Sequence, residues 1–152
     1  MRKLTILIVI LFSAEFLQAQ DLPAFNFAIE HMAFSVKDVD RSAEFYKNVL
    51  KLREITNRSK LDGVRWFSLA EGKELHLIAI LKEKVAINKS VHLALTTPQF
   101  DAFTERLDKM KIPYSDWPGA DHKINIRADG IKQIFFQDPD GYWIEINSTA
   151  QN

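Results

Sequence analysis

The sequence predicts an α+β fold built from two similar βαβββ modules, at about residues 26–81 and 87–149. Two observations carry this prediction: the stretch that begins at His31 nearly repeats at His92, and the stretch that ends each half repeats as well. A third is that each half changes from period-two alternation to helical periodicity and then back to strand-like runs. Repetition on this scale is typical of one supersecondary unit used twice.

The opening strands are predicted by direct alignment of the two halves. "HMAFSVKDVDRSAEFYKNVLKL" lies over "HLALTTPQFDAFTERLDKMKIP" without a gap, which pairs His31 with His92 and Ala33 with Ala94. In each case apolar and small or polar residues alternate over about six positions, as expected of a half-buried strand.

A helix is predicted after each opening strand. Apolar residues recur at helical spacing in both segments: Phe45, Tyr46, Val49 and Leu50 in the first, and Phe100, Phe103, Leu107 and Met110 in the second. We expect Asp40 and Thr97 to be the N-caps, with Pro98 at the first helical position of the second helix.

The ends of the two halves also correspond. "WFSLAEGKELHLI" lies over "FFQDPDGYWIEIN", which pairs Gly72 with Gly141 and His76 with Glu145. The second half is eight residues longer, and we place the extra residues within "DWPGADHKINIRADG". Asp138-Pro139-Asp140-Gly141 predicts a tight turn, and the aromatic and β-branched run after it predicts a strand.

Residues 1–20 have the three-part form of a secretory signal peptide. Met1-Arg2-Lys3 is basic, Leu4 to Phe12 is a nine-residue apolar run, and small Ala19 lies near the end. Nine residues make only ~14 Å of helix, short of the ~30 Å needed to cross a bilayer. We therefore expect an exported protein, periplasmic or secreted, whose folded domain lies within residues 21–152.

Composition narrows the classes of partner and chemistry. Of 152 residues, 47% are hydrophobic, which suits a globular domain. The formal net charge is zero, so there is no electrostatic reason to expect binding to nucleic acid or, once the signal peptide is cleaved, to a membrane. There is no Cys, which excludes disulfides and thiolate chemistry.

Four polar residues are predicted to share one face of the sheets. His31, His76, His92 and Glu145 each lie in a strand whose alternate positions are apolar and should face the helices. One His on such a face is usually a satisfied structural residue. Three His and one carboxylate at equivalent places in two modules instead indicate a metal site, because imidazole and carboxylate suit Zn, Ni, Co, Mn or Fe(II).

Aromatic residues accompany these four. Trp66 and Phe135 occupy equivalent strand positions, and Trp143 shares a face with Glu145. They are candidates for lining a substrate cleft, with burial in the core as the alternative. His122 has no counterpart in the first half and is expected to be an exposed loop residue.

The segments "HMAFSVKDVDRSAEFYKNVL" and "DPDGYWIEI" resemble the vicinal oxygen chelate superfamily, which includes glyoxalase I, bleomycin-resistance proteins and extradiol dioxygenases. The resemblance covers about residues 26–149. It implies that the two modules form a curved, cleft-like barrel around one divalent metal ion, with Zn the first expectation. By position it implies that His31, His76, His92 and Glu145 are the ligands, with Glu145 also the catalytic base. It also implies a homodimer, and it leaves open whether the metal site forms within one chain or across the dimer.

The same resemblance leaves several functions open. The leading hypothesis is a glyoxalase-like lyase or isomerase acting on a small molecule chelated through two neighbouring oxygens. The alternatives are a metal-free binding protein of the antibiotic-resistance type and an Fe(II) extradiol-type dioxygenase. Ser35 and Ile80 stand where many bacterial glyoxalase I enzymes have the Arg and Asn that hold glutathione, so we do not expect glutathione dependence.

Overall fold

The computed structural model describes residues 28–81, 83 and 85–149. The predicted signal peptide, residues 1–20, lies outside this range, so the expectation of export stays a prediction. Within the described part of the chain, no helix is both long and apolar enough to span a bilayer.

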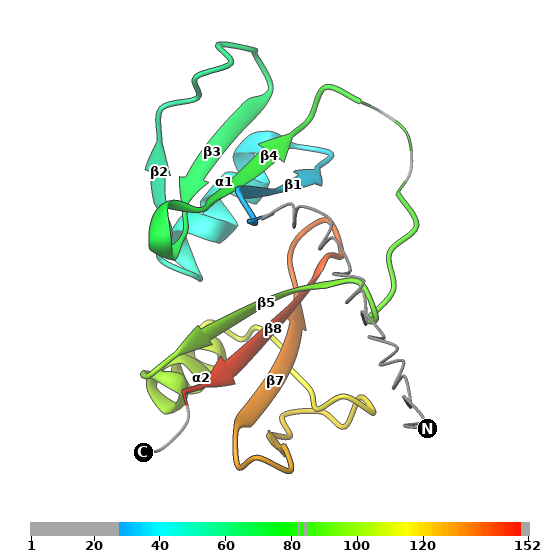
Figure 1. Cartoon of the computed structure of the whole chain (residues 1–152). Helices are drawn as coiled ribbons and strands as arrows, with labels where there is room; N and C mark the ends of the chain where they lie inside the picture. Colours follow the sequence, from blue (N-terminus) through cyan, green and yellow to red (C-terminus); the bar gives the residue numbers. More distant parts are fainter. Residues whose placement is uncertain (1–27, 82, 84, 150–152) are drawn as a thin grey trace, which may run out of the picture.

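The chain forms two four-stranded mixed sheets, each accompanied by one α-helix, which confirms the predicted α+β class (Figure 1). The first module contains β1 (His31–Ser35), α1 (Val39–Asn48), β2 (Arg53–Ile55), β3 (Val64–Ser68), a 3₁₀ turn (Ala70–Gly72) and β4 (Glu74–Ile78). The second contains β5 (His92–Thr97), α2 (Phe100–Lys109), β6 (Asn125–Ile126), β7 (Lys132–Gln137) and β8 (Trp143–Ser148).

Strand order is the same in both sheets: β1-β4-β3-β2 in the first and β5-β8-β7-β6 in the second. The opening strand of each module pairs in parallel with the last strand, and the remaining pairs are antiparallel. The opening strands β1 and β5 therefore each lie at one edge of their sheet.

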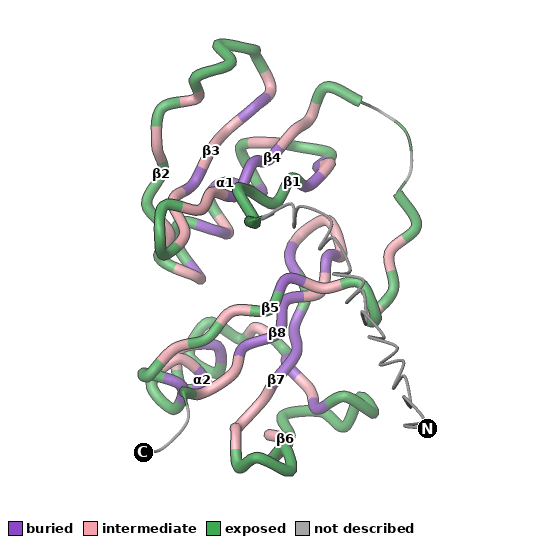
Figure 2. The backbone as a smooth tube through the Cα atoms, in the orientation of Figure 1, coloured by how far each residue is buried: buried purple, intermediate pink, exposed green. Residues whose placement is uncertain are grey.

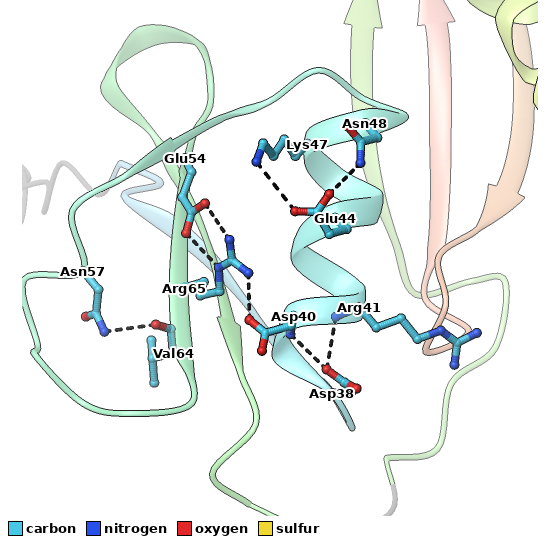
Figure 3. A network of polar contacts seen from close by, with 10 residues as sticks. All are labelled: Asp38, Asp40, Arg41, Glu44, Lys47, Asn48, Glu54, Asn57, Val64 and Arg65. Atoms are coloured by element: carbon cyan, nitrogen blue, oxygen red, sulfur yellow. Dashed lines mark hydrogen bonds and ion pairs between the residues drawn. The ribbon is translucent and has the colours of Figure 1, made fainter.

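Helix α1 begins at a different cap from the expected one. The Asp38 carboxylate accepts hydrogen bonds from the backbone N–H groups of Asp40 and Arg41, so Asp38 is the N-cap and the prediction of Asp40 is wrong. The Asp40 carboxylate instead pairs with the guanidinium of Arg65, which also forms a two-point ion pair with Glu54 (Figure 3). This network ties the start of α1 to strands β2 and β3.

Helix α2 begins later than expected, at Phe100, with Gln99 in the cap position and no side chain capping it. Thr97 lies in β5, and its hydroxyl accepts a hydrogen bond from the backbone N–H of Gln99. Thr97 therefore stabilises the turn before the helix instead of capping it, because the two turn residues Pro98 and Gln99 separate it from the first helical residue.

The core is one cluster of apolar side chains that runs through both modules. Helix α1 packs on β3 and β4, and α2 packs on β8. Buried residues follow β7 and β8 toward the turn between them (Figure 2). Met32 is 40% exposed although the alternation predicted it to face inward, since it lies near the start of an edge strand.

The predicted turn at Asp138–Gly141 joins β7 to β8 and also joins the two modules. The N–H of Gly141 donates to the carbonyl of Asp138, and Gly141 has φ of +93°, a conformation that Gly adopts at little cost. In Figure 1 this turn (orange) reaches from the second sheet to the first module.

Two carboxylates of the turn receive donors from the first module. The hydroxyl of Tyr46 donates to Asp138 at 2.8 Å, and the hydroxyl of Ser42 donates to Asp140 at 2.5 Å. The backbone N–H of Lys37 also donates to Asp140. Tyr142 completes the junction, because its ring stacks on Phe34 with centroids 4.2 Å apart.

The longer connection of the second half folds against β7. Ser115 forms bridges with Asp121 and Phe135, and β6 follows it. His122 is exposed here, as predicted, and its Nδ1 lies 3.0 Å from a carboxylate oxygen of Asp108.

We predict that Tyr46→Phe lowers the free energy of unfolding by about 1.5–3 kcal/mol at pH 7, because it removes a hydrogen bond to a buried carboxylate. Burial raises the pKa of Asp138 above its ordinary 3.8, and the hydrogen bond from Tyr46 opposes that rise. The folded state then retains the Asp138 proton more strongly than the unfolded state. This group's contribution to stability therefore falls as the pH rises from 3.8 through the folded pKa.

Asp138→Asn is the control for the pH dependence. It keeps an oxygen acceptor for the backbone N–H groups of Asp140 and Tyr142 but cannot ionise. Urea unfolding between pH 4 and pH 7 should show a smaller decline for Asp138→Asn than for the natural protein, and a steeper decline for Tyr46→Phe. Parallel curves for all three proteins would contradict this role of Asp138.

Candidate metal centre

His31 and His76 come together on the first sheet. His76 pairs in the sheet with Ala33 on β1 and with Trp66 on β3. The rings of His31 and His76 are stacked, with centroids 4.3 Å apart and planes inclined by 17°. His31 is exposed and its Nδ1 contacts Glu30, whereas His76 is buried.

His76 is held on two sides. Its other face stacks on Trp66 with centroids 4.0 Å apart, and its Nε2 lies 2.8 Å from a carboxylate oxygen of Glu74. Arg58 completes the arrangement: its guanidinium lies 4.5 Å above the Trp66 ring and forms an ion pair with Glu74. The hydrogen bond with His76, followed by that with Arg58, lowers the pKa of Glu74 below its ordinary value.

The stacked pair cannot share one metal ion as it stands. A metal bound to imidazole lies in the plane of the ring, ~2.0 Å from the nitrogen. Two planes inclined by only 17° and stacked on one another meet far beyond that reach. One ring must therefore turn before both can bind the same ion, and the exposed His31 is freer to do so than the clamped His76.

His92 and Glu145 come together on the second sheet in a different geometry. Glu145 pairs with Ala94 on β5 and with Phe135 on β7, so it occupies the position that His76 has in the first sheet. The Nε2 of His92 lies 2.9 Å from Oε2 of Glu145. Two ligand atoms this close can share a metal ion with bonds of ~2.0–2.2 Å, so this pair fits a divalent ion.

Neighbouring groups orient both members of this pair. The Nδ1 of His92 lies 2.9 Å from the backbone carbonyl oxygen of Lys89, which directs Nε2 toward Glu145. The side-chain amides of Gln133 and Asn147 donate to Oε1 of Glu145 at 2.8 and 2.6 Å. Such outer contacts are typical of ligands held ready for a metal. Among the described residues, Oδ1 of Asn147 is buried and has no hydrogen-bond partner.

The aromatic residues expected near a cleft lie beside these pairs, each in contact with a cation. Trp66 lies beneath Arg58, as described above. Phe135 is almost fully buried and Trp143 is half-buried, and the ammonium group of Lys89 lies 4.6 and 4.7 Å above their rings. Lys89, Arg58 and Glu74 were not predicted as site residues, because no periodic pattern marks them in the sequence. Charged residues near strand ends and in connections usually face solvent.

The four predicted ligands are therefore arranged as two pairs, one on each sheet. Within residues 28–81, 83 and 85–149, no three His, Cys, Asp or Glu side chains are close enough together to hold a metal ion. The assignment of all four as ligands of one ion stays a prediction, and it requires that the two pairs be brought together.

Residues 28–146 match the family model described as "Glyoxalase/Bleomycin resistance protein/Dioxygenase superfamily". The chain is 32% identical over 127 residues to "Metallothiol transferase FosB" of Shouchella clausii, which covers 79% of this chain and 79% of that protein. It is 28% identical over 127 residues to "Glyoxylase I 4" of Arabidopsis thaliana, which covers 78% of this chain and 69% of that protein.

A solved structure shares the fold. The lactoylglutathione lyase of Agrobacterium tumefaciens superposes with a TM-score of 0.63 at 19% sequence identity, over 81% of this chain and 94% of that one. At this level of identity the likeness shows a common fold.

We predict that Gln133→Met lowers the free energy of unfolding by about 1.5 kcal/mol, because a hydrogen bond to a buried carboxylate is lost. Gln137→Met is the matched control: Gln137 lies on the same strand, is exposed, and donates to the backbone carbonyl of Gly141 instead of to a carboxylate. Denaturant unfolding without added metal measures both. Equal losses for the two variants would show that Gln133 does not hold Glu145 in solution.

Proposed function

Because the chain belongs to the Glyoxalase/Bleomycin resistance protein/Dioxygenase superfamily, we propose that it is an exported, metal-dependent enzyme of the lyase or isomerase type. Its substrate would be a small molecule that presents two neighbouring oxygens. Names of related proteins, a glyoxylase I and a metallothiol transferase, support an enzyme of this general kind. The basic and apolar start of residues 1–20 supports export, which the intact mass of protein from its native compartment tests.

The observation that carries this proposal is the pair formed by His92 and Glu145. Their ligand atoms are 2.9 Å apart, both side chains are oriented by neighbours, and Glu145 is buried. A buried carboxylate beside an imidazole is costly to retain without a partner of opposite charge. A divalent ion would provide that partner.

We further propose that a second copy of the chain completes the site. His31 and His76 of one copy would meet His92 and Glu145 of the other, and a two-fold axis would create two such sites. Strands β1 and β5, which carry one ligand of each pair, lie at sheet edges, and exposed edges favour pairing or coverage by another chain. His31 would turn away from His76 on assembly.

The residues divide the chemistry between them. A bound divalent ion would polarise the two substrate oxygens as a Lewis acid. Glu145 would leave the ion to take a proton from the carbon beside the substrate carbonyl and to return it, while Gln133 and Asn147 hold Oε1. Ala33 and Ala94, beside His76 and Glu145 in the sheets, leave space for a small substrate.

A second candidate function is favoured by the clamping of His76. Because Glu74 occupies its Nε2 and Trp66 its ring face, His76 can remain where it is while His31, His92 and Glu145 bind the ion. Two imidazoles and one carboxylate with open positions are the ligand set of Fe(II) oxygenases. Iron in the purified protein, with oxygen uptake during turnover, would favour this function over the lyase or isomerase. A protein that takes up no metal at all would favour the metal-free binder.

We predict that the protein binds Zn²⁺ and that His92→Ala lowers its affinity by at least about tenfold, because one of the ligands is lost. Isothermal titration calorimetry measures this directly. Zn²⁺ at 100 times its dissociation constant should also stabilise the natural protein by about 2.7 kcal/mol. His122→Ala removes an exposed His outside the site and should leave both values unchanged. Absence of metal binding in the natural protein would exclude the proposed function.

A mixing experiment tests whether two copies share each site. One variant carries His31→Ala and His76→Ala, and the other carries His92→Ala and Glu145→Ala. Neither alone should bind Zn²⁺ at the site. After mixed refolding, about half of the dimers contain one copy of each variant. Each of these mixed dimers has one intact site where the wild-type dimer has two, so about a quarter of the wild-type metal per chain is expected. No recovery of binding would show that each site forms within one chain.

A further inference from the structure

The geometry points to Lys89 as a specificity-determining residue that favours an anionic substrate. This inference rests on the proposed function, since it concerns the ligand that binds beside His92 and Glu145. It assigns a role to a residue in the connection between the modules, outside the strands that carry the predicted ligands.

The ammonium group of Lys89 is held by neutral oxygens. It donates to the carbonyl oxygens of Asp116 and Trp117 at 2.5 and 3.1 Å and to the hydroxyl of Ser115 at 3.2 Å. It forms no ion pair with a carboxylate in the part of the chain that the structure describes; the nearby Asp116 carboxylate pairs with Lys123 instead. The positive charge is therefore fixed in place by neutral groups.

Aromatic rings flank the same ammonium group and shield it partly from water. It lies over Phe135 and Trp143 at 4.6 and 4.7 Å and faces Trp117 at 5.8 Å. Partial burial lowers the pKa of Lys89 below its ordinary 10.5, and attraction to the Asp116 carboxylate opposes that shift. Coulomb attraction is stronger where water is partly displaced, so this charge acts more strongly on a neighbouring ligand than a fully solvated charge would.

This charge lies next to the candidate site. Phe135 is the cross-strand partner of Glu145, and Trp143 precedes Glu145 by two positions on the same face of β8. The ring of His92 meets Phe135 edge to face, with centroids 5.7 Å apart. The carbonyl of Lys89 itself accepts from His92. A substrate bound at His92 and Glu145 would therefore meet the field of this ammonium group.

The two modules each hold a cation above an aromatic ring, but they differ in whether a carboxylate pairs with it. In the first module Arg58 occupies the corresponding place, above the cross-strand partner of His76, but Glu74 neutralises it. In the second module no carboxylate of the described residues forms an ion pair with the cation above the cross-strand partner of Glu145, and the Asp116 carboxylate attracts it only from beyond ion-pair distance. Because all three donors of Lys89 are already engaged, it would act through its charge and not through a direct hydrogen bond to the substrate.

The experiment compares two planar anions of the same shape, oxalate with two charges and oxamate with one, by calorimetry on the Zn²⁺-loaded protein. Lys89→Gln keeps a side-chain donor but removes the charge. It should weaken oxalate binding about tenfold and oxamate binding about threefold, because the Coulomb energy scales with ligand charge. Lys89→Arg keeps the charge and should restore most of the affinity for both anions. Lys109→Gln is the control: Lys109 is exposed on α2 and pairs with Glu105, so its replacement should change neither value.

The outcomes distinguish this inference from the proposed function. Equal effects of Lys89→Gln on both anions, or no effect, with Zn²⁺ affinity unchanged, would overturn the role of Lys89 and leave the metalloenzyme standing. A fall in Zn²⁺ affinity for Lys89→Gln with the oxalate-to-oxamate ratio unchanged would also overturn it, since Lys89 would then only position His92. If the natural protein binds no Zn²⁺, the proposed function fails first.

Discussion

The carboxylate of Asp138 is the group on which both the junction of the modules and the start of strand β8 depend. It accepts hydrogen bonds from the backbone N–H groups of Asp140 and Tyr142, which shape the turn, and from the hydroxyl of Tyr46 in the other module. This turn sets where β8 begins, and Glu145 follows Tyr142 by three residues. The hydrogen bond between Tyr46 and Asp138, which joins the two modules, therefore also fixes the position of Glu145. Burial of Asp138 is unfavourable for its charge, and its hydrogen bonds offset that cost.

The duplication then places the candidate ligands by sheet register. His76 and Glu145 each lie between an Ala on a parallel neighbour and an aromatic residue on an antiparallel neighbour, with a cation above the aromatic ring. The scaffold is thus the same in both halves, and the difference lies in the side chain placed at its centre. The first half holds two stacked imidazoles, which cannot share a metal ion without a change of ring orientation. The second half holds an imidazole and a carboxylate whose ligand atoms already lie close enough to share one.

The sequence was sufficient for features that follow from repetition and local chemistry. Alignment of His31 with His92 and of His76 with Glu145 predicted the equivalence that the strand pairing later displayed, and Asp138–Gly141 predicted its turn. The helix starts were misplaced, because several Asp and Thr residues nearby compete as caps and only the folded backbone selects one. The separation of the four polar residues into two pairs was also beyond reach, since alternation predicts which face a side chain occupies but not whether two faces meet. Arg58 and Lys89 approach their rings from loops, whose paths depend on tertiary contacts.

The connection between β4 and β5 has a consequence for how the molecule responds to dilution. It joins Ile78 to His92 within one chain, and Lys89 secures its far end to the second module. Because the connection is short, each module experiences the other at an effective concentration on the order of millimolar. This value does not depend on the concentration of the protein in solution. Contacts between separate copies have no such advantage. On dilution, separate copies should therefore part while the two modules of each chain stay together, so any activity that needs two copies would fall while each chain remains folded.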